Sequence, residues 1–155
     1  MNEPSSTPEA VQALLFKRIQ ASFRDAVEAA GTARDRAARA LNLHPTDFAC
    51  LDYLQRAGEP VSPKQIIAHL NLSSGSGTAL LDRLESSGYT RRLPNPQDRR
   101  SILIELDQET AKKPLLRLKE MEHSYTALIQ SFSEPDLQAV ARFMEEMSRF
   151  AKKLD

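Results

Sequence analysis

Apolar residues recur every three or four positions over most of this chain, a spacing typical of amphipathic helices. The first such run follows Thr7-Pro8-Glu9, a capping hydroxyl, a proline and an acid that together favour a helix start. The run consists of Val11, Leu14, Leu15, Ile19, Phe23 and Val27. Gly31-Thr32 is expected to interrupt or bend this helix before it resumes through Leu41. The resumed part carries three arginines that are expected to form a solvated face: Arg34, Arg36 and Arg39.

The middle of the chain predicts a helix-turn-helix. A helix over residues 45–57 should end at Gly58, which suits a left-handed cap. A capping-box pattern at residues 62–65 then opens a short helix. Another helix opens at residues 73–74 and runs to about Ser87. Because only three to four residues separate these two short helices, they are expected to form a helix-turn-helix.

A β-hairpin is predicted directly after this motif. Residues Tyr89–Leu93 form one expected strand, and Ser101–Leu106 form the other, in which apolar and polar residues alternate as in a half-buried strand. The residues 94–100 between them are rich in turn-forming residues and are expected to form a long basic loop. A hairpin in this place would be the wing of a winged helix-turn-helix.

The last third of the chain predicts two more helices. Pro114 should kink the first of them or place its start near Lys113. Ser133-Glu134-Pro135-Asp136 should break the chain and cap the second. The apolar stripe of the first helix contains Leu118, Met121, Tyr125, Leu128, Ile129 and Phe132. That of the second is a heptad seam of Leu137, Val140, Met144, Met147, Ala151 and Leu154.

These terminal helices carry more apolar surface than a small winged module can cover, so a second chain is expected to bury the excess. The predicted fold is mostly α with a small β-hairpin: a winged helix-turn-helix flanked by N- and C-terminal dimerisation helices. Its expected parts are a flexible tail (1–6), an N-terminal dimerisation helix (7–43), the winged helix-turn-helix (44–107) and C-terminal dimerisation helices (108–155). Together they should form one compact domain.

Composition narrows the possible partners. Lys and Arg number 21, as do Asp and Glu, so that any nucleic-acid-binding patch in this 155-residue chain must be local. No apolar run is long enough for a membrane span, and the N-terminus lacks the features of a secretory signal. A cytoplasmic protein without membrane contact is therefore expected.

The helix that opens at Ser73 is the first candidate DNA contact. Hydroxyl residues are dense at its start, and Gly75 and Gly77 each cost about 1 kcal/mol relative to alanine inside a helix. Helix stability alone gives no reason for these glycines. A helix start that must lie close against phosphates or base edges would give one, and the helix dipole would also attract phosphate.

The hairpin tip is the second candidate. Four arginines against one acid make the hairpin net positive in a neutral protein: Arg91, Arg92, Arg99 and Arg100 against Asp98. Arginine is attracted by the enhanced negative potential of a narrow minor groove. An acid two positions before an arginine can hold the guanidinium in place.

The segment from Leu54 to Leu106 resembles the winged helix-turn-helix of the MarR family of bacterial transcription regulators. The resemblance is carried by Leu81-Asp82-Arg83-Leu84-Glu85, Gly88-Tyr89 and Pro94-Asn95-Pro96-Gln97-Asp98-Arg99-Arg100. It implies that Arg100 enters the minor groove with Asp98 as its orienting partner. The chain departs from the family at Ala79, where many members have a basic residue, so that Arg83 is left as a candidate phosphate contact.

The resulting expectation is a homodimeric, sequence-specific DNA-binding transcription regulator, a repressor released by a small-molecule effector. Its partner would be double-stranded DNA with a pseudo-palindromic operator. The predicted DNA-binding residues are Ser62, Lys64, Ser73, Ser74, Gly75, Ser76, Gly77, Thr78, Arg83, Asp98, Arg99 and Arg100. The resemblance also implies an effector pocket, for which the candidate lining residues are Phe16, Phe23, His44, Phe48 and Tyr53. The alternative is a winged-helix protein-interaction module that no longer recognises DNA.

Other chemistries find little support in the sequence. Cys50 is expected to be a core residue rather than a peroxide sensor, because no base near it in sequence would lower its thiol pKa. His44, His69 and His123 lack the spacing of a metal site, so no metal or cofactor is expected. No phosphate loop or Ser/His/Asp grouping is present, and an enzyme is not expected.

Overall fold

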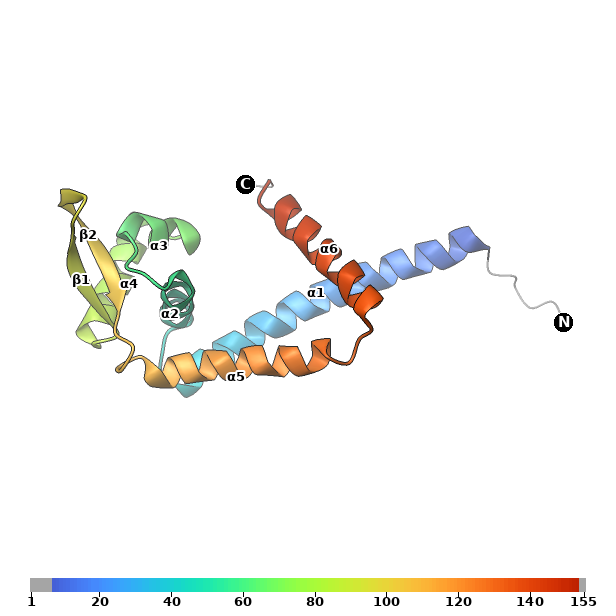
Figure 1. The fold of residues 1–155 in the computed structure, drawn as a ribbon, viewed down its shortest axis with the longest axis horizontal. Coiled ribbons are helices and arrows are strands. Elements are labelled where there is room, and N and C mark those ends of the chain that lie inside the picture. Colours follow the sequence, from blue (N-terminus) through green and yellow to red (C-terminus); the bar gives the residue numbers. More distant parts are fainter. Residues whose placement is uncertain (1–6, 154–155) are drawn as a thin grey trace. The chain divides into compact units, whose positions relative to one another are not determined.

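The computed structural model describes residues 7–153, which form helices and one two-stranded antiparallel sheet (Figure 1). The elements are, in chain order, α1 (Pro8–Ala40), α2 (Pro45–Ala57), α3 (Pro63–His69), α4 (Ser74–Ser86), β1 (Thr90–Asn95), β2 (Asp98–Leu106), α5 (Lys112–Ile129) and α6 (Glu134–Ala151). This confirms the predicted fold class. The chain divides after Pro114 into two compact units.

Helix α1 is continuous over 33 residues, so the expected interruption at Gly31-Thr32 is wrong. Thr7 caps its start by accepting a hydrogen bond from the Ala10 amide. Gly31 lowers helix propensity but keeps its backbone hydrogen-bonding groups, unlike a proline, so that it does not end the helix. Within α1 only Ala37 and Ala38 are buried. Most of this long helix therefore leaves its apolar stripe exposed.

Helix α2 is the centre of the winged module, by which we mean residues 45–106. It packs against α1, α4 and β2. The buried core of the module consists of Cys50, Leu51, Leu54, Val61, Ile66, Leu80, Leu81, Leu84 and Ile104. The backbone of Val61 exchanges two hydrogen bonds with that of Ile104, which ties the segment before α3 to β2.

Two acidic residues of α2 connect it to its neighbours. Asp52 accepts hydrogen bonds from Arg34 of α1 at 2.6 Å and from Arg56 at 3.1 Å. The expectation that Arg34 lies on a purely solvated face is therefore wrong. Asp47 is paired with Arg83 of α4. Two carboxylates of α2 thus connect it to α1 and α4.

The helix-turn-helix and hairpin follow the sequence expectations in their order but not in the length of the strands. Ser62 and Gln65 form the predicted capping box, and Ser73 caps α4. The strands extend through most of the segment 94–100, leaving only Pro96 and Gln97 as the turn. The prediction of a long loop was wrong, because turn-forming residues here shape a bulged strand instead.

The second unit, residues 115–155, contains most of α5 and all of α6. Helix α5 begins at Lys112, which confirms the start predicted near Lys113, and Ser133 caps α6 as expected. In α6 no residue is buried, and Val140, Phe143, Met144 and Phe150 are among its exposed apolar side chains. Leu154, the last residue of the predicted seam, lies outside the described residues. None of the helices in the described part of the chain is long and apolar enough to cross a membrane.

Candidate nucleic-acid interface

The N-terminus of α4 presents an exposed cluster of hydroxyl groups. Ser73 Oγ accepts a hydrogen bond from the Ser76 amide at 3.2 Å and donates one to Ser76 Oγ at 2.9 Å. Thr78 Oγ1 donates to the carbonyl oxygen of Ser74 at 3.0 Å. All of these residues are exposed, so the first turn of α4 is ordered by its own side chains and faces outward.

The two glycines of α4 have different surroundings. A Cβ at Gly77 would lie 2.3 Å from Cγ1 of Ile67, so this glycine lets α3 and α4 pack closely. The inference that helix stability gives no reason for it was wrong. At Gly75 a Cβ would meet no atom within 4 Å. For Gly75, packing within the chain gives no explanation, and its role in the close approach of a binding partner stays a prediction.

Arg83 is held within the winged module. Its Nη2 donates to Asp47 Oδ1 at 2.6 Å, and its Nε donates to Oδ2 of the same carboxylate at 3.4 Å. Hydrogen bonding to Asp47 raises the pKa of the Arg83 guanidinium above its ordinary value. The side chain is 48% exposed, so a phosphate can still approach it, but part of its charge is already neutralised.

A bulge shapes the tip of the hairpin. Pro94 pairs with Ile102 and Asn95 pairs with Asp98, so that residues 99–101 have no partner on the facing strand. A bulge of this kind bends the strand and redirects the side chains that it carries. Arg99 and Arg100 are therefore displaced from the ladder and exposed.

Short polar side chains hold this bulge in one conformation. Asn95 donates to Ser101 Oγ at 2.9 Å, and its Oδ1 accepts from the Gln97 amide at 2.9 Å. Ser101 Oγ in turn donates to the carbonyl oxygen of Asp98 at 3.1 Å. Asp98 Oδ1 accepts from the Arg100 backbone amide at 3.0 Å. Asp98 thus orders the backbone beneath Arg100, rather than its guanidinium as predicted.

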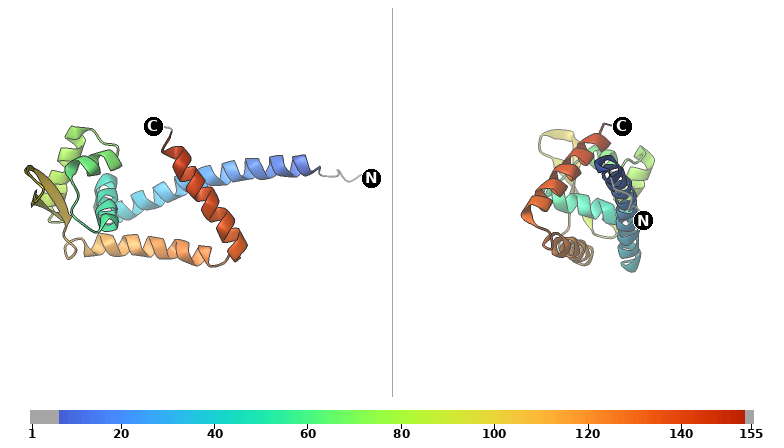
Figure 2. Two further views of the ribbon diagram at one scale, coloured as in Figure 1. Left: turned by 45° about the horizontal axis from the view of Figure 1, so that its top comes forward. Right: turned by 90° about the vertical axis from the view of Figure 1, so that its right-hand side faces the viewer.

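The four arginines of the hairpin fall into two classes. Arg91 forms ion pairs with Glu105 and Asp107. Arg92 forms ion pairs with Asp82 and Glu85 of α4. Within the described residues 7–153, Arg99 and Arg100 form no ion pair. The positive charge available to a partner is therefore concentrated at the tip, which projects beyond the helices of the module (Figures 1 and 2).

The other candidate DNA contacts lie at the start of α3. Ser62 Oγ accepts from the Gln65 amide, and its backbone amide donates to Gln65 Oε1 at 3.0 Å. Lys64 is exposed. Ser62 therefore has a structural role as a helix cap. Lys64, by contrast, forms no ion pair with another residue of the winged module.

Comparison with known proteins identifies the chain. A family model described as "MarR family" matches residues 41–101. The HTH-type transcriptional regulator YcgE of Bacillus subtilis is 37% identical over 109 residues, which cover 70% of each chain. The chain belongs to the MarR family.

Other relatives share part of the sequence or the fold alone. The regulator PecS of Dickeya dadantii is 39% identical over 79 residues, covering 50% of this chain and 48% of PecS. The crystal structure of Streptococcus pneumoniae FabT in complex with DNA aligns with a TM-score of 0.75 at 20% identity, covering 90% of this chain and 99% of FabT. The apo MarR of Escherichia coli aligns with a TM-score of 0.61 at 19% identity, covering 82% and 95%.

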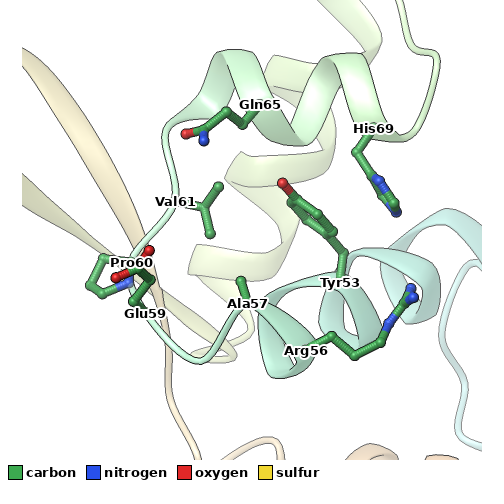
Figure 3. Close-up of a pocket in the computed structure, with 8 residues that line it drawn as sticks. All are labelled: Tyr53, Arg56, Ala57, Glu59, Pro60, Val61, Gln65 and His69. Atoms are coloured by element: carbon green, nitrogen blue, oxygen red, sulfur yellow. The ribbon is translucent and has the colours of Figure 1, made fainter.

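The predicted effector residues are not brought together in this member of the MarR family. Phe48 is 1% exposed in the core, whereas Phe16 is 61% exposed on α1 and Phe23 is half-buried. Tyr53 lines a cavity of about 360 Å³ between α2 and α3, where its ring stacks on His69 at 4.0 Å (Figure 3). His44 lines a different cavity beside α4, together with Ser76 and Arg83.

Cys50 is a buried thiol. It is fully buried on α2, and burial, followed by the charge of Asp47, raises its pKa to about 12. An oxidant-sensing thiol needs a lowered pKa and solvent access, so the environment of Cys50 opposes that role. Among the described residues, no three His, Cys, Asp or Glu side chains are grouped as metal ligands.

Sequence reasoning missed three residues that position the interface. Asp47 fixes α4 through Arg83, while Asn95 and Ser101 hold the bulge that carries the tip arginines. A signal existed for Asp47, because a carboxylate on a helix whose neighbours Phe48 and Cys50 are apolar needs a cationic partner. Asn95 and Ser101 carried no comparable signal, since a bulge depends on strand register.

Proposed function

We propose that this MarR-family chain is a homodimeric DNA-binding transcription repressor that a small-molecule effector releases from its operator. Each subunit would place the start of α4 in the major groove and the hairpin tip in the adjacent minor groove. Two-fold symmetry would then require a pseudo-palindromic operator with half-sites about one helical turn apart. Family membership supports the regulatory role, and the FabT–DNA complex on the same fold supports DNA binding.

The observation that carries this proposal is the contrast between the arginines of the hairpin. Arg91 and Arg92 are neutralised at its base by acids of the same chain. Arg99 and Arg100 are exposed on an ordered bulge and form no ion pair within residues 7–153. These two arginines are therefore available to an external anion. The narrow minor groove of DNA concentrates negative potential and suits such arginines.

The exposed terminal helices support the proposal of a dimer. Six large apolar side chains of α1 are exposed: Val11, Leu14, Leu15, Phe16, Ile19 and Val27. Helix α6 exposes the predicted seam residues Val140 and Met144. On α1, Val11, Leu14, Leu15 and Ile19 follow helical spacing and share one face, and an exposed apolar stripe of this kind marks an interface. A second copy of the chain supplies an equally apolar surface, as a two-fold interface requires.

The proposal of release by an effector rests on the family resemblance and on two cavities of the winged module. Tyr53 and His44 line cavities that adjoin α3 and α4, respectively. A ligand that occupied either cavity in only one arrangement of the helices would shift the population towards that arrangement. Which residues line the effector site stays a prediction.

Substitution at the tip tests DNA binding. Arg100→Ala should weaken binding of a duplex covering the upstream region of the protein's own gene by about 1–3 kcal/mol, and lower the salt dependence by about one counterion. Fluorescence anisotropy titrations at several salt concentrations would measure both. The matched control is Arg91→Ala in the same hairpin, which removes a cation already paired with Glu105 and should change affinity far less.

Equal losses in both variants would show that only net charge matters and would refute the wing assignment. If the unsubstituted chain binds no duplex even at low salt, the winged module serves protein interaction instead. Circular dichroism of each variant separates these outcomes from unfolding.

A charged residue in the α6 seam tests the dimer. Met144→Glu should convert the dimer to monomers, because an unpaired carboxylate in an apolar interface costs several kcal/mol. Sedimentation velocity at micromolar concentration would measure the change. Ala139→Glu, on the same helix but off the seam, is the control and should sediment as the unsubstituted chain does. A monomeric unsubstituted chain would contradict the proposed dimer.

A further inference from the structure

The exposed face of α4 lacks the side chains that most often recognise bases. Between Ser74 and Leu81 it has no arginine, lysine, asparagine or glutamine. These are the residues that bind guanine or adenine bidentately in the major groove. The first such residue along the helix is Arg83, whose guanidinium is already held by Asp47 at 2.6 Å. Direct recognition of purine edges by the start of α4 is therefore largely unavailable.

The hydroxyl groups on this face do not discriminate between bases either. The hydroxyl of Thr78 donates within the helix to Ser74, and Ser76 Oγ accepts from Ser73. The serine hydroxyls can form further hydrogen bonds, but they can do so with several kinds of base edge or with phosphate. Such contacts add affinity without selecting a sequence.

Methyl groups are the remaining groups on this face of α4 that can discriminate between bases. Thr78 and Ala79 are exposed, and each carries a methyl group on the outside of α4. Because residues three and four positions apart share a helix face, both lie beside Gly75. A Cβ at Gly75 would meet nothing within 4 Å, so the missing side chain leaves open space next to these two methyls. The helix can therefore approach a groove floor closely at this point.

Thymine is the base that displays a methyl group in the major groove. We propose that α4 selects its half-sites by contact between the methyl groups of Thr78 and Ala79 and the C5-methyl groups of thymine. This inference rests on the proposed DNA-binding function and specifies which bases that function would prefer. Gly75 provides the close approach, Ser73 and Ser76 order the helix start, and the tip arginines supply affinity outside the half-site.

Removal of the thymine methyl tests this contact. Selection of the full-length chain against a randomised duplex library should recover half-sites that contain thymine in the segment that α4 covers. Replacing each of these thymines by deoxyuridine, one at a time, removes only the C5-methyl. At one or two positions affinity should fall by about fourfold per methyl, from the transfer free energy of one buried carbon group. Deoxyuridine placed outside the half-sites is the control and should have no effect.

A double-mutant cycle assigns the contact to Thr78. Thr78→Ser removes the methyl and keeps the hydroxyl that bonds to Ser74. The variant should lose a similar factor on the thymine duplex and should then be insensitive to deoxyuridine at the coupled position. Such non-additivity identifies groups in direct contact.

The outcomes separate the two proposals. Half-sites without thymine under α4, or uracil duplexes bound as tightly as thymine duplexes at every half-site position, would overturn the methyl contact and leave DNA binding intact. Additive losses in the cycle would overturn the role of Thr78. A library from which no duplex is enriched would overturn the proposed function itself.

Discussion

The winged module and the terminal helices bury their apolar residues to opposite degrees. In the module, nine residues from α2, α3, α4 and β2 and the segment before α3 form a core in which none is more than 5% exposed. Helix α6 has no buried residue among its 18, and α1 buries only Ala37 and Ala38 of 33. Both regions have amphipathic sequences. The difference shows that the module completes its core within one chain, whereas α1 and α6 leave their apolar stripes exposed, as the proposed dimer requires.

The ion pairs differ in the same way. In the module, carboxylates of α2 that are largely buried pair with Arg34 and Arg83 of neighbouring helices. On α6, Arg149 pairs with Glu145 and Glu146 of its own helix, and all three are more than 60% exposed. Pairs of the first kind connect elements that are distant in sequence. The pairs on α6 join residues of one helix surface and so do not connect that helix to another element.

The largest expected effect comes from removing core volume in the module. Leu51 is fully buried, and Leu51→Ala should lower the free energy of unfolding by about 2–5 kcal/mol, through lost transfer energy and the cavity that remains. Urea denaturation would measure it. The comparison residue is Leu14 of α1, which is 68% exposed. Leu14→Ala should weaken the proposed dimer while leaving hydrogen-exchange protection of the α2 amides unchanged. Loss of that protection in Leu14→Ala would contradict the division between the two regions.

A smaller effect is expected where α3 and α4 approach each other. Gly77→Ala places a methyl where Ile67 now lies, and should destabilise the module by about 1–3 kcal/mol because the stiff isoleucine side chain must move. Thermal unfolding would measure the loss. Gly75→Ala is the matched control, because its methyl meets no neighbour. It should be neutral or stabilise by up to about 1 kcal/mol. Equal destabilisation by both variants would show that helix packing does not distinguish them.

Most of the fold could be predicted because its signals are local. Capping residues such as Ser62 and Ser133, and the left-handed Gly58, marked helix boundaries that the structure confirms. Gly31 misled the prediction, since a glycine lowers helix propensity without removing a hydrogen bond. The strand register at the hairpin tip was also missed, because turn-forming residues at 94–100 indicate a change of direction but not how the strands on either side pair.

The candidate site was predictable in its location and less so in its internal contacts. The serines of α4 and the tip arginines lie exposed where the sequence placed them. The sequence offered no way to separate Gly75 from Gly77, or Arg91 from Arg100, since each distinction depends on residues from other elements. Ile67 fills the space beside Gly77, and Glu105 neutralises Arg91. Contacts across the fold, rather than motifs, decide which members of a motif remain available to a partner.

The smallest expected effect is the difference in stability lost when an ion pair of each region is broken. Arg83→Ala leaves Asp47, which is 7% exposed, without its cation. A fully buried pair broken in this way loses about 3–5 kcal/mol, but Arg83 is half exposed and water can reach the carboxylate, so about 1–2 kcal/mol is expected. Arg149→Ala removes an exposed pair within one helix and should cost under about 1 kcal/mol. Urea unfolding at low and high salt would compare the two losses, with salt diminishing the Arg149 effect more because exposed charges are screened.

If the two losses were equal, Asp47 would be no more important to the position of α4 than a surface acid. The larger loss for Arg83→Ala would instead make Asp47 the residue that fixes the orientation of the helix proposed to enter the groove.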